Sequence, residues 1–446
     1  MEVKLKVWEV LKNNRMSIFF VGIAFVILVV LFSIILDIIH SPNSKKATKI
    51  YFADNISPAL KILIDRFNLA YEGEIEVVPI DLPFSKFSTN ERKELLARSL
   101  RSKSDLIDVF AGDLIWSARF AKWVHPLNYF FESSELNLIL NYSLESCYYE
   151  EKLVAIPLYI DVGLMYYRRD ILEKHPQFYI WEEILKKSIT WEDFIELQKR
   201  YFRGVNPFYM FPAKNYEGLV CSLAELILSQ NKSSFSKDTI TINTPESKRA
   251  LQLLVDLVNK YHLTPSAVLN FDEYQSYVYS LKNDAIFFRG WSGFMQNHSR
   301  IIEEAGKKGL FGVAALPHFE GSSPVSVFGG WNLMISKSSN HLDEAVKFLK
   351  FALKKENQEM MYSVGGYLPV NYQVYQDRKF VDQNEFLDYY QKLLKNGVHR
   401  PYTSDYTKKS DIISFYVHQA IKKELTTEEA LAKVEVLMNT DKFIVK

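Results

Sequence analysis

The sequence predicts an α/β protein made of two lobes, preceded by one transmembrane helix. Three observations lead to this fold class. The chain has 446 residues, too many for one small domain and suited to two large lobes. Strand-like and helix-like segments alternate, which is typical of a parallel sheet with covering helices. An uncharged stretch of 20 residues, Ser17–Leu36, comes before the first of these segments.

The stretch Ser17–Leu36 is expected to span a membrane. Extended to Ile39 as a helix, it crosses a hydrocarbon core of about 30 Å. It is longer than the apolar part of a cleaved signal peptide, about 7–15 residues, and neither a cleavage site nor a lipid-anchoring cysteine follows it. The resulting prediction for this region is a cytoplasmic N-terminus at 1–15, a transmembrane signal anchor at 16–40 and a polar linker at 41–48, with the rest outside the cytoplasm.

The next segments alternate between strand and helix patterns. The expected elements are a strand at 49–53, a helix at Ser57–Ala70, a strand at 74–80, a helix at Asn90–Arg101 and a strand at 106–112. Ser57 is a favourable N-cap, and Pro58 stands at the first helical position. This order favours a parallel sheet covered by helices.

A second alternation starts near Tyr159. The expected elements are a strand opening into a helix at 158–172, helices at 190–202, 216–230 and 245–262, and a strand at 282–291. Thr190 is expected to cap its helix, with Asp193 at the third helical position. An apolar strand at 328–336 precedes a mostly helical C-terminal part that ends at 426–438, capped by Thr426 or Thr427.

Charge and motif content exclude several classes of function. The chain has 54 basic and 53 acidic residues, so no basic excess points to nucleic acid as a partner. Serine-hydrolase, phosphate-binding, zinc-protease and dinucleotide-binding motifs are absent. We therefore expect a protein that is not an enzyme and has no cofactor, although an unrecognised pair of glycosidase carboxylates stays open.

The two cysteines, Cys147 and Cys221, lie in no metal-binding spacing. A metal site is therefore not expected. A disulfide between them and two buried free thiols remain equally open alternatives.

Large aromatic residues stand beside glycines at three strand or loop ends. Because glycine lets the backbone turn sharply and approach another group closely, these rings suggest a ligand-facing surface. The three aromatic residues with their glycines are Trp291 beside Gly290 and Gly293, Trp331 after Gly329 and Gly330, and Tyr367 after Gly365 and Gly366.

Two aspartates follow or interrupt apolar strands. Asp113 ends a predicted strand, and Trp116 comes three residues later. A carboxylate and an indole at a strand's carboxyl end suit a sugar, because the carboxylate accepts hydroxyl hydrogen bonds and the ring covers a C–H face. Asp113 could instead cap the following helix. Asp161 lies between two apolar runs, where a turn aspartate is the alternative.

Three further residues are weaker candidates. Tyr216 and Glu217 open a helix, where a glutamate is ordinary because it favours the helix dipole. Arg400 lies in a loop and offers a rigid fork of donors to hydroxyls or carboxylates. A solvated loop arginine is the alternative reading.

Lys49–Met438 resembles the family 1 extracellular solute-binding proteins of ABC importers, and among them the trehalose/maltose-type disaccharide binders. One segment, residues 83–100, departs from the family pattern, so the resemblance does not imply which sugar binds. The segments that carry the resemblance are DVFAGDLIWSARFAKWVHPL, LVAIPLYIDVGLMYYRRDIL, YEGLVC, NDAIFFRGW, GGWNLMIS, GGYLPV and RPYTSDY.

The resemblance implies the two-lobe periplasmic-binding-protein (Venus flytrap) fold, in which crossing hinge segments join the lobes and sugar binds between them. The implied ranges are 49–158 and 284–332 for the first lobe, and 159–283 and 333–446 for the second. It also implies a monomeric ectodomain that delivers a di- or oligosaccharide to ABC permease subunits. A membrane-tethered sugar sensor and a glycan-active enzyme are the alternatives.

The family's ligand contacts carry over to matching positions. Asp113, Asp161 and Glu217 would accept hydroxyl hydrogen bonds. Trp291, Trp331 and Tyr367 would stack on the sugar rings. Arg400 would donate to oxygens, and the backbone of Gly329 and Gly330 would border the cleft. With Trp116 and Tyr216, these residues make up the predicted ligand-binding site.

Overall fold

The computed structural model describes residues 28–32, 47–84, 86–236 and 239–440. The predicted N-terminus at 1–15 lies outside these residues, as do most of the predicted anchor at 16–40 and linker at 41–48; residues 28–32 are helical and exposed. None of the described helices has the length and apolar character needed to cross a membrane. The predicted anchor therefore stays a prediction.

The chain divides into two compact units. The smaller unit comprises Met1–Thr48 and Tyr71–Glu76, and the larger comprises Lys49–Ala70 and Val77–Lys446. In the smaller unit, the backbone N–H of Glu74 donates to the carbonyl of Tyr71 at 2.9 Å, which closes a turn. The cavity and the helices described below lie in the larger unit.

A nine-stranded sheet runs through the protein in the order β2-β1-β3-β10-β6-β8-β7, with β11 paired to β10 and β9 paired to β6. Strands β1 and β3 are parallel, whereas β10 is antiparallel to both of its long neighbours, β3 and β6. The strands are β1 (Thr48–Asp54), β2 (Ile75–Asp81), β3 (Val109–Asp113), β6 (Ile156–Arg168), β7 (Tyr209–Met210), β8 (Phe287–Trp291), β9 (Phe311–Ala314), β10 (Ser326–Ile335) and β11 (Gly397–Val398), and a separate hairpin is formed by β4 (Tyr148–Tyr149) and β5 (Lys152–Leu153).

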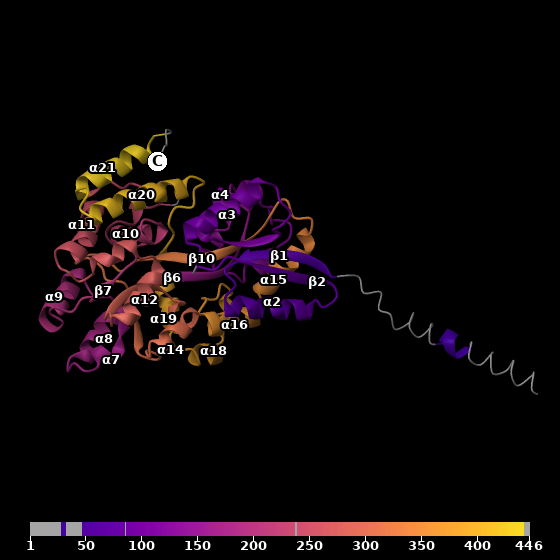
Figure 1. Cartoon of the computed structure of the whole chain (residues 1–446), viewed down its shortest axis with the longest axis horizontal. Coiled ribbons are helices and arrows are strands. Elements are labelled where there is room, and N and C mark those ends of the chain that lie inside the picture. The colour runs from indigo at the N-terminus through magenta and orange to yellow at the C-terminus, as the bar shows by residue number, and fades with distance from the viewer. Residues whose placement is uncertain (1–27, 33–46, 85, 237–238, 441–446) are drawn as a thin grey trace, which may run out of the picture. The chain divides into compact units, whose positions relative to one another are not determined.

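Strands β6 and β10 connect two halves of this sheet, as Figure 1 shows. The first half of the sheet contains β2, β1 and β3, and the second half contains β8, β7 and β9. Strand β10 pairs with β3 of the first half and with the first part of β6. The second part of β6 pairs with β8 and β9 of the second half. The buried apolar side chains of both strands make them part of the core. These two strands are therefore the segments that cross between the halves.

Helices α2 (Pro58–Ala70), α3 (Thr89–Arg101), α15 (Leu342–Ala352) and α16 (Lys355–Gly365) belong to the first half. The Phe67 ring of α2 lies 5.2 Å from that of Phe348 and 5.3 Å from that of Phe351. The part of residues 342–365 that forms α15 thus packs against α2. The mostly helical character predicted for the C-terminal part begins with these two helices, α15 and α16.

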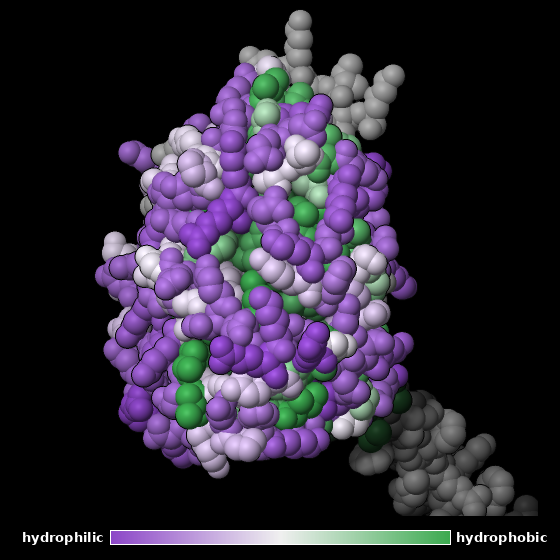
Figure 2. Space-filling model, turned by 90° about the vertical axis from the view of Figure 1, so that its left-hand side faces the viewer, coloured by the Kyte–Doolittle hydropathy of each residue, from purple (hydrophilic) through white to green (hydrophobic). Residues whose placement is uncertain are grey.

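Helices α9 (Trp191–Tyr201), α10 (Glu217–Gln230), α11 (Pro245–Asn259), α12 (Glu273–Lys282), α20 (Tyr406–Ile421) and α21 (Thr427–Met438) belong to the second half. Helix α10 is buried almost throughout because α11 and α20 pack against it. Strand β8 pairs with β6 and β7 here, whereas the end of the predicted segment 284–332 lies in β10 beside β3. The predicted lobe ranges stay a prediction. The face shown in Figure 2 is mainly hydrophilic.

Several local predictions are confirmed. The hydroxyl of Thr190 accepts from the backbone N–H of Asp193 at 3.1 Å, and Thr426 caps α21 through a capping box with Glu429. Cys147 and Cys221 are buried, free thiols, so the disulfide alternative is wrong.

The remaining helices are α4 (Ser117–Phe120), α5 (Ser133–Leu136), α6 (Asn141–Glu145), α7 (Arg169–Leu172), α8 (Phe178–Lys187), α13 (Phe294–Asn297), α14 (Ser299–Glu304), α17 (Tyr372–Gln376), α18 (Arg378–Asp382) and α19 (Leu387–Leu394).

Candidate functional site

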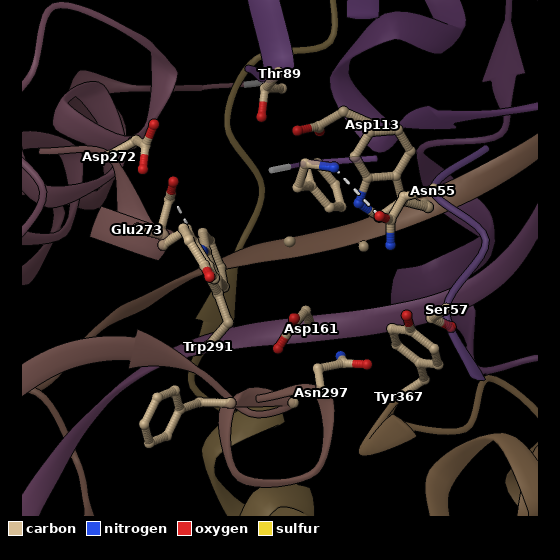
Figure 3. Close-up of a pocket in the computed structure, with 18 of the residues that line it drawn as sticks. Asn55, Ser57, Thr89, Asp113, Asp161, Asp272, Glu273, Trp291, Asn297 and Tyr367 are labelled. Carbon is tan, nitrogen blue, oxygen red and sulfur yellow. Dashed lines mark hydrogen bonds between the residues drawn. The ribbon is translucent and has the colours of Figure 1, made fainter. Parts of the chain in front are cut away.

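A cavity of about 430 Å³ lies where β3, β6, β8 and β10 bring their polar and aromatic residues together. Figure 3 shows side chains from both halves of the sheet that point into it. All of the predicted site residues except Trp116 line this cavity: Asp113, Asp161, Tyr216, Glu217, Trp291, Gly329, Gly330, Trp331, Tyr367 and Arg400. Trp116 is buried behind the wall, with its ring edge-on to Trp331 at 5.3 Å.

Asp161 points from β6 into the cavity (Figure 3). One carboxylate oxygen, Oδ1, accepts the backbone N–H groups of Val162 at 2.9 Å and Ser292 at 2.8 Å, as well as the Ser292 hydroxyl. Among the described residues, none donates to Oδ2. Burial raises the pKa of Asp161 to about 6, and these hydrogen bonds oppose that rise. The side chain is therefore fixed, with one oxygen available to a ligand.

Asp113 stands at the end of β3, directly across the ladder from Trp331 of β10. Its Oδ1 accepts the backbone N–H of Ile115 at 3.2 Å, so it caps the following turn as the alternative reading held, and it still lines the cavity. The guanidinium of Arg400 lies 3.4 Å from the same oxygen. Burial raises the pKa of Asp113 to about 6, with Arg400 acting against the rise and Glu217 adding to it.

Glu217 is held by donors from the protein itself. Its Oε1 accepts from Arg400 Nη1 at 2.6 Å and from the Tyr406 hydroxyl at 2.8 Å, and its Oε2 accepts from the Ser410 hydroxyl. Glu217 thus anchors the segment that carries Arg400. The prediction that it accepts ligand hydroxyls has less support than for Asp113 or Asp161, because both oxygens are engaged.

Arg400 is buried between both halves of the sheet. Its Nη1 bonds to Glu217, and its Nη2 donates to Asp113 and to the carbonyl of Phe328 at 3.2 Å. Its Nε is buried and has no hydrogen-bond partner among the described residues. The solvated-loop alternative is wrong, because Arg400 is buried and bonded to both Glu217 and Asp113.

Trp291 forms one aromatic wall. Its indole N–H donates to Glu273 Oε1 at 3.4 Å, and its backbone N–H donates to the hydroxyl of Tyr277 at 3.1 Å. The guanidinium of Arg289 lies 4.0 Å from the centre of the ring. Arg289 is itself bonded to Glu225 through Nε at 3.2 Å and Nη2 at 2.9 Å. Hydrogen bonds and a buried ion pair therefore fix this indole.

Trp331 forms the second aromatic wall and is 8% exposed. Its ring meets the edges of Phe84 at 5.7 Å and Trp116 at 5.3 Å. The guanidinium of Arg92 lies 4.2 Å from the ring centre. Ring packing and a buried arginine fix this indole.

The two glycines between these walls have different roles. Gly330 adopts φ 128°, and a Cβ there would lie 2.5 Å from the carbonyl oxygen of Tyr159, so no other residue fits without moving backbone. A Cβ on Gly329 would instead lie 2.8 Å from the Trp291 ring. Gly330 thus serves the crossing of β10 and β6, and Gly329 leaves room for the indole.

Tyr367 and Tyr216 are placed by partners that the sequence did not suggest. The Tyr367 ring stacks on that of Tyr159, with centroids 4.2 Å apart and planes 27° apart. The Tyr216 hydroxyl donates to Glu273, the same carboxylate that accepts from Trp291. Glu273 therefore orients two predicted site residues.

Sequence reasoning missed several cavity residues. Asn55 and Ser57 follow β1, and the carboxyl ends of strands are where ligands bind in open α/β sheets, so this signal was present. Asp272 caps α12 in a capping box with Gln275, and Glu273 is an acidic residue of the first turn, so both have an ordinary structural explanation in sequence. Further lining residues include Phe84, Thr89, Tyr159, Tyr274, Tyr277, Asn297 and His298.

The chemistry of this cavity favours binding a hydroxyl-rich, ring-shaped molecule. Two indoles offer apolar faces for C–H groups, and two partly buried aspartates each keep an oxygen for hydroxyl donors. Within the described parts of the chain, no cluster of three or more histidine, cysteine, aspartate or glutamate side chains could hold a metal ion.

Comparison with known proteins gives a family match. The model of the bacterial extracellular solute-binding protein family matches residues 63–388. A probable ABC transporter-binding protein from Deinococcus radiodurans is 27% identical over 358 residues, covering 78% of this chain and 83% of the relative. An arabinooligosaccharide-binding protein from Bacillus subtilis is 22% identical over 292 residues, covering 62% of this chain and 64% of the relative.

A solved structure of similar architecture is maltose-bound MalE3 from T. maritima. It aligns with a TM-score of 0.77 at 29% identity, covering 88% of this chain and 99% of the solved chain. This likeness confirms the predicted α/β two-lobe periplasmic-binding-protein fold.

Proposed function

The chain belongs to the bacterial extracellular solute-binding protein family, and from this premise we propose that it is the extracytoplasmic binding subunit of an ABC importer. It captures a di- or oligosaccharide in the cavity between the two halves of the sheet and delivers it to a permease. The relatives from D. radiodurans and B. subtilis and the maltose-bound structure from T. maritima support this proposal through what their names state.

One observation carries the proposal. Trp291 and Trp331 border the same cavity as Asp113 and Asp161, two partly buried carboxylates that each keep an oxygen to which no described residue donates. Sugars have apolar C–H faces and hydroxyl edges, so they need this combination of rings and acceptors. A volume of about 430 Å³ also lies within the usual range for small-molecule sites, about 300–1,000 Å³.

The protein performs no reaction in this proposal. A ligand that contacts both halves of the sheet binds the closed arrangement more tightly than an open one, and so shifts the population towards closure. The permease reads that closed form. The predicted helix at 16–40 tethers the binding region to the membrane and keeps it near the permease, which raises its effective concentration there.

A thermal-shift screen of the full-length protein against mono-, di- and trisaccharides tests this proposal. The detergent must carry no sugar headgroup, because a glycosidic detergent would compete for the cavity. A disaccharide at 100 times its Kd should stabilise the protein by about 2.7 kcal/mol and raise its melting temperature. No shift with any saccharide of the panel would contradict the proposal.

A further inference from the structure

The guanidinium of Arg92 lies between two aromatic rings at the cavity wall. Its central carbon is 4.2 Å from the centre of the Trp331 ring and 4.3 Å from the centre of the Phe84 ring. Planar guanidinium groups stack on aromatic faces, and the attraction grows when water is excluded. Arg92 is fully buried, so both conditions hold.

Arg92 makes few hydrogen bonds, so its contacts with the two rings contribute much of what holds it. Its Nη2 bonds to Asp54 at 2.5 Å, which balances the charge. Its Nε and Nη1 have no hydrogen-bond partner among the described residues. Arg289, its counterpart behind Trp291, instead bonds to Glu225 through two nitrogens. Arg92 is therefore held more by rings than by hydrogen bonds.

Phe84 extends this aromatic wall into the cavity. It is a lining residue, 39% exposed, whereas Trp331 is 8% exposed. Its backbone N–H donates to Asn55 Oδ1 at 3.2 Å, and its ring meets the edge of Trp331 at 5.7 Å. A large exposed ring in a cavity is apolar surface that a ligand can cover.

We propose that Phe84, Arg92 and Trp331 form one recognition unit, in which Arg92 is a positioning residue and Phe84 is an additional face that contacts the ligand. This inference rests on the proposed saccharide binding. Phe84 is 39% exposed and its ring lies beside that of Trp331, so in this proposal a saccharide that extends beyond the Trp331 ring covers it. The unit therefore increases the preference for longer saccharides.

Fluorine NMR of the free, full-length protein tests the positioning role without any ligand. The chain has seven tryptophans, so 5-fluorotryptophan labelling gives seven signals, and Trp331→Phe and Trp291→Phe assign two of them. Arg92→Met should shift or broaden the Trp331 signal and leave the Trp291 signal unchanged. The matched variant Arg289→Met should do the reverse. An unchanged Trp331 signal in Arg92→Met would overturn the role of Arg92.

A second comparison separates positioning from plain stability. Arg92→Met leaves Asp54 buried without its ion-pair partner, and the added change Asp54→Asn removes that charge. The double variant should regain thermal stability but keep the altered Trp331 signal and a saccharide affinity about tenfold below wild type. Recovery of both signal and affinity would show that Arg92 acts only through stability. Arg92→Lys should not restore the signal, because its ammonium lacks the plane that stacks.

Calorimetry with saccharides of increasing length tests the role of Phe84. Phe84→Ala should weaken trisaccharide binding about threefold to tenfold and leave monosaccharide binding unchanged. Equal losses at every length, or no loss, would overturn the selectivity claim. If the wild-type protein bound no saccharide, the proposed function and this selectivity would both fall, while the fluorine spectra would still decide whether Arg92 positions Trp331.

Discussion

The two aromatic walls of the cavity present the same ring type but fix it in different ways. Trp291 is hydrogen-bonded to Glu273 and backed by Arg289, whose charge Glu225 balances through two bonds. Trp331 is packed among rings, and the arginine behind it has one bonded nitrogen. One wall depends on ionic and hydrogen-bonding partners, and the other depends on shape.

The largest expected difference between the walls is in folding stability. Arg289→Met leaves Glu225 buried and unpaired, which should lower the free energy of unfolding by about 3–5 kcal/mol. Arg92→Met should cost less, about 1–3 kcal/mol, because Arg92 bonds to Asp54 through one nitrogen whereas Arg289 bonds to Glu225 through two.

Urea unfolding of the two variants measures this difference. The control is Arg289→Met combined with Glu225→Gln, which removes the unpaired charge and should recover much of the loss. Equal losses in both single variants would contradict the distinction between the walls.

Substitution of the two adjacent glycines should have smaller effects, which differ between Gly330 and Gly329. Gly330→Ala places a Cβ against the Tyr159 backbone at positive φ and should cost about 1–3 kcal/mol of stability. Gly329→Ala presses on the Trp291 ring instead, so saccharide affinity should fall more than stability does. Thermal unfolding and calorimetry on the pair check this, and an inverted pattern would show that the glycines have the opposite roles.

The pH dependence tests the aspartate that each wall carries. The pKa values of Asp113 and Asp161 are raised to about 6, above the unfolded value of about 3.9. As the pH falls, the folded state therefore binds protons at a higher pH than the unfolded state does. As the pH falls from 7 to 5, these two groups should increase the stability of the free protein. Saccharide affinity should fall over the same range, because a protonated carboxyl accepts fewer hydroxyl hydrogen bonds.

The variants Asp113→Asn and Asp161→Asn provide the control for this prediction. Each should remove part of the dependence, and the double variant should remove the part that arises near pH 6. A dependence that persists unchanged in the double variant would assign it to other groups.

The smallest expected effect is at Trp116, which the sequence predicted to be a ligand contact. Because it is buried behind Trp331, Trp116→Phe should change saccharide affinity by less than about threefold, or about 0.6 kcal/mol. Calorimetry measures this. A loss of saccharide affinity as large as that of Trp331→Ala would show that Trp116 contacts the ligand.

Local patterns predicted much of this molecule. The caps at Thr190 and Thr426 are formed, and the glycine-flanked rings at Trp291, Trp331 and Tyr367 do meet in one cavity. These features depend on neighbouring residues, so a single sequence reveals them. Their contact with a ligand stays a prediction.

Long-range pairing explains what the sequence did not reveal. Arg92 lies in a charged helix and reads as a solvated residue, yet the fold buries it against a strand more than two hundred residues away. The pairing of β8 with β6 and β7 is likewise set over long sequence distances, so local patterns could not reveal it. Such partners are set by the tertiary fold and not by local spacing.

Calorimetric titration of a disaccharide into wild type, Trp291→Ala and Trp331→Ala tests most directly that the ligand lies between the two walls. Thermal unfolding must first show that each variant is folded at the titration temperature. Each substitution should weaken binding by at least about 1–3 kcal/mol, because it removes a stacking face. Wild-type affinity in Trp331→Ala would contradict the account.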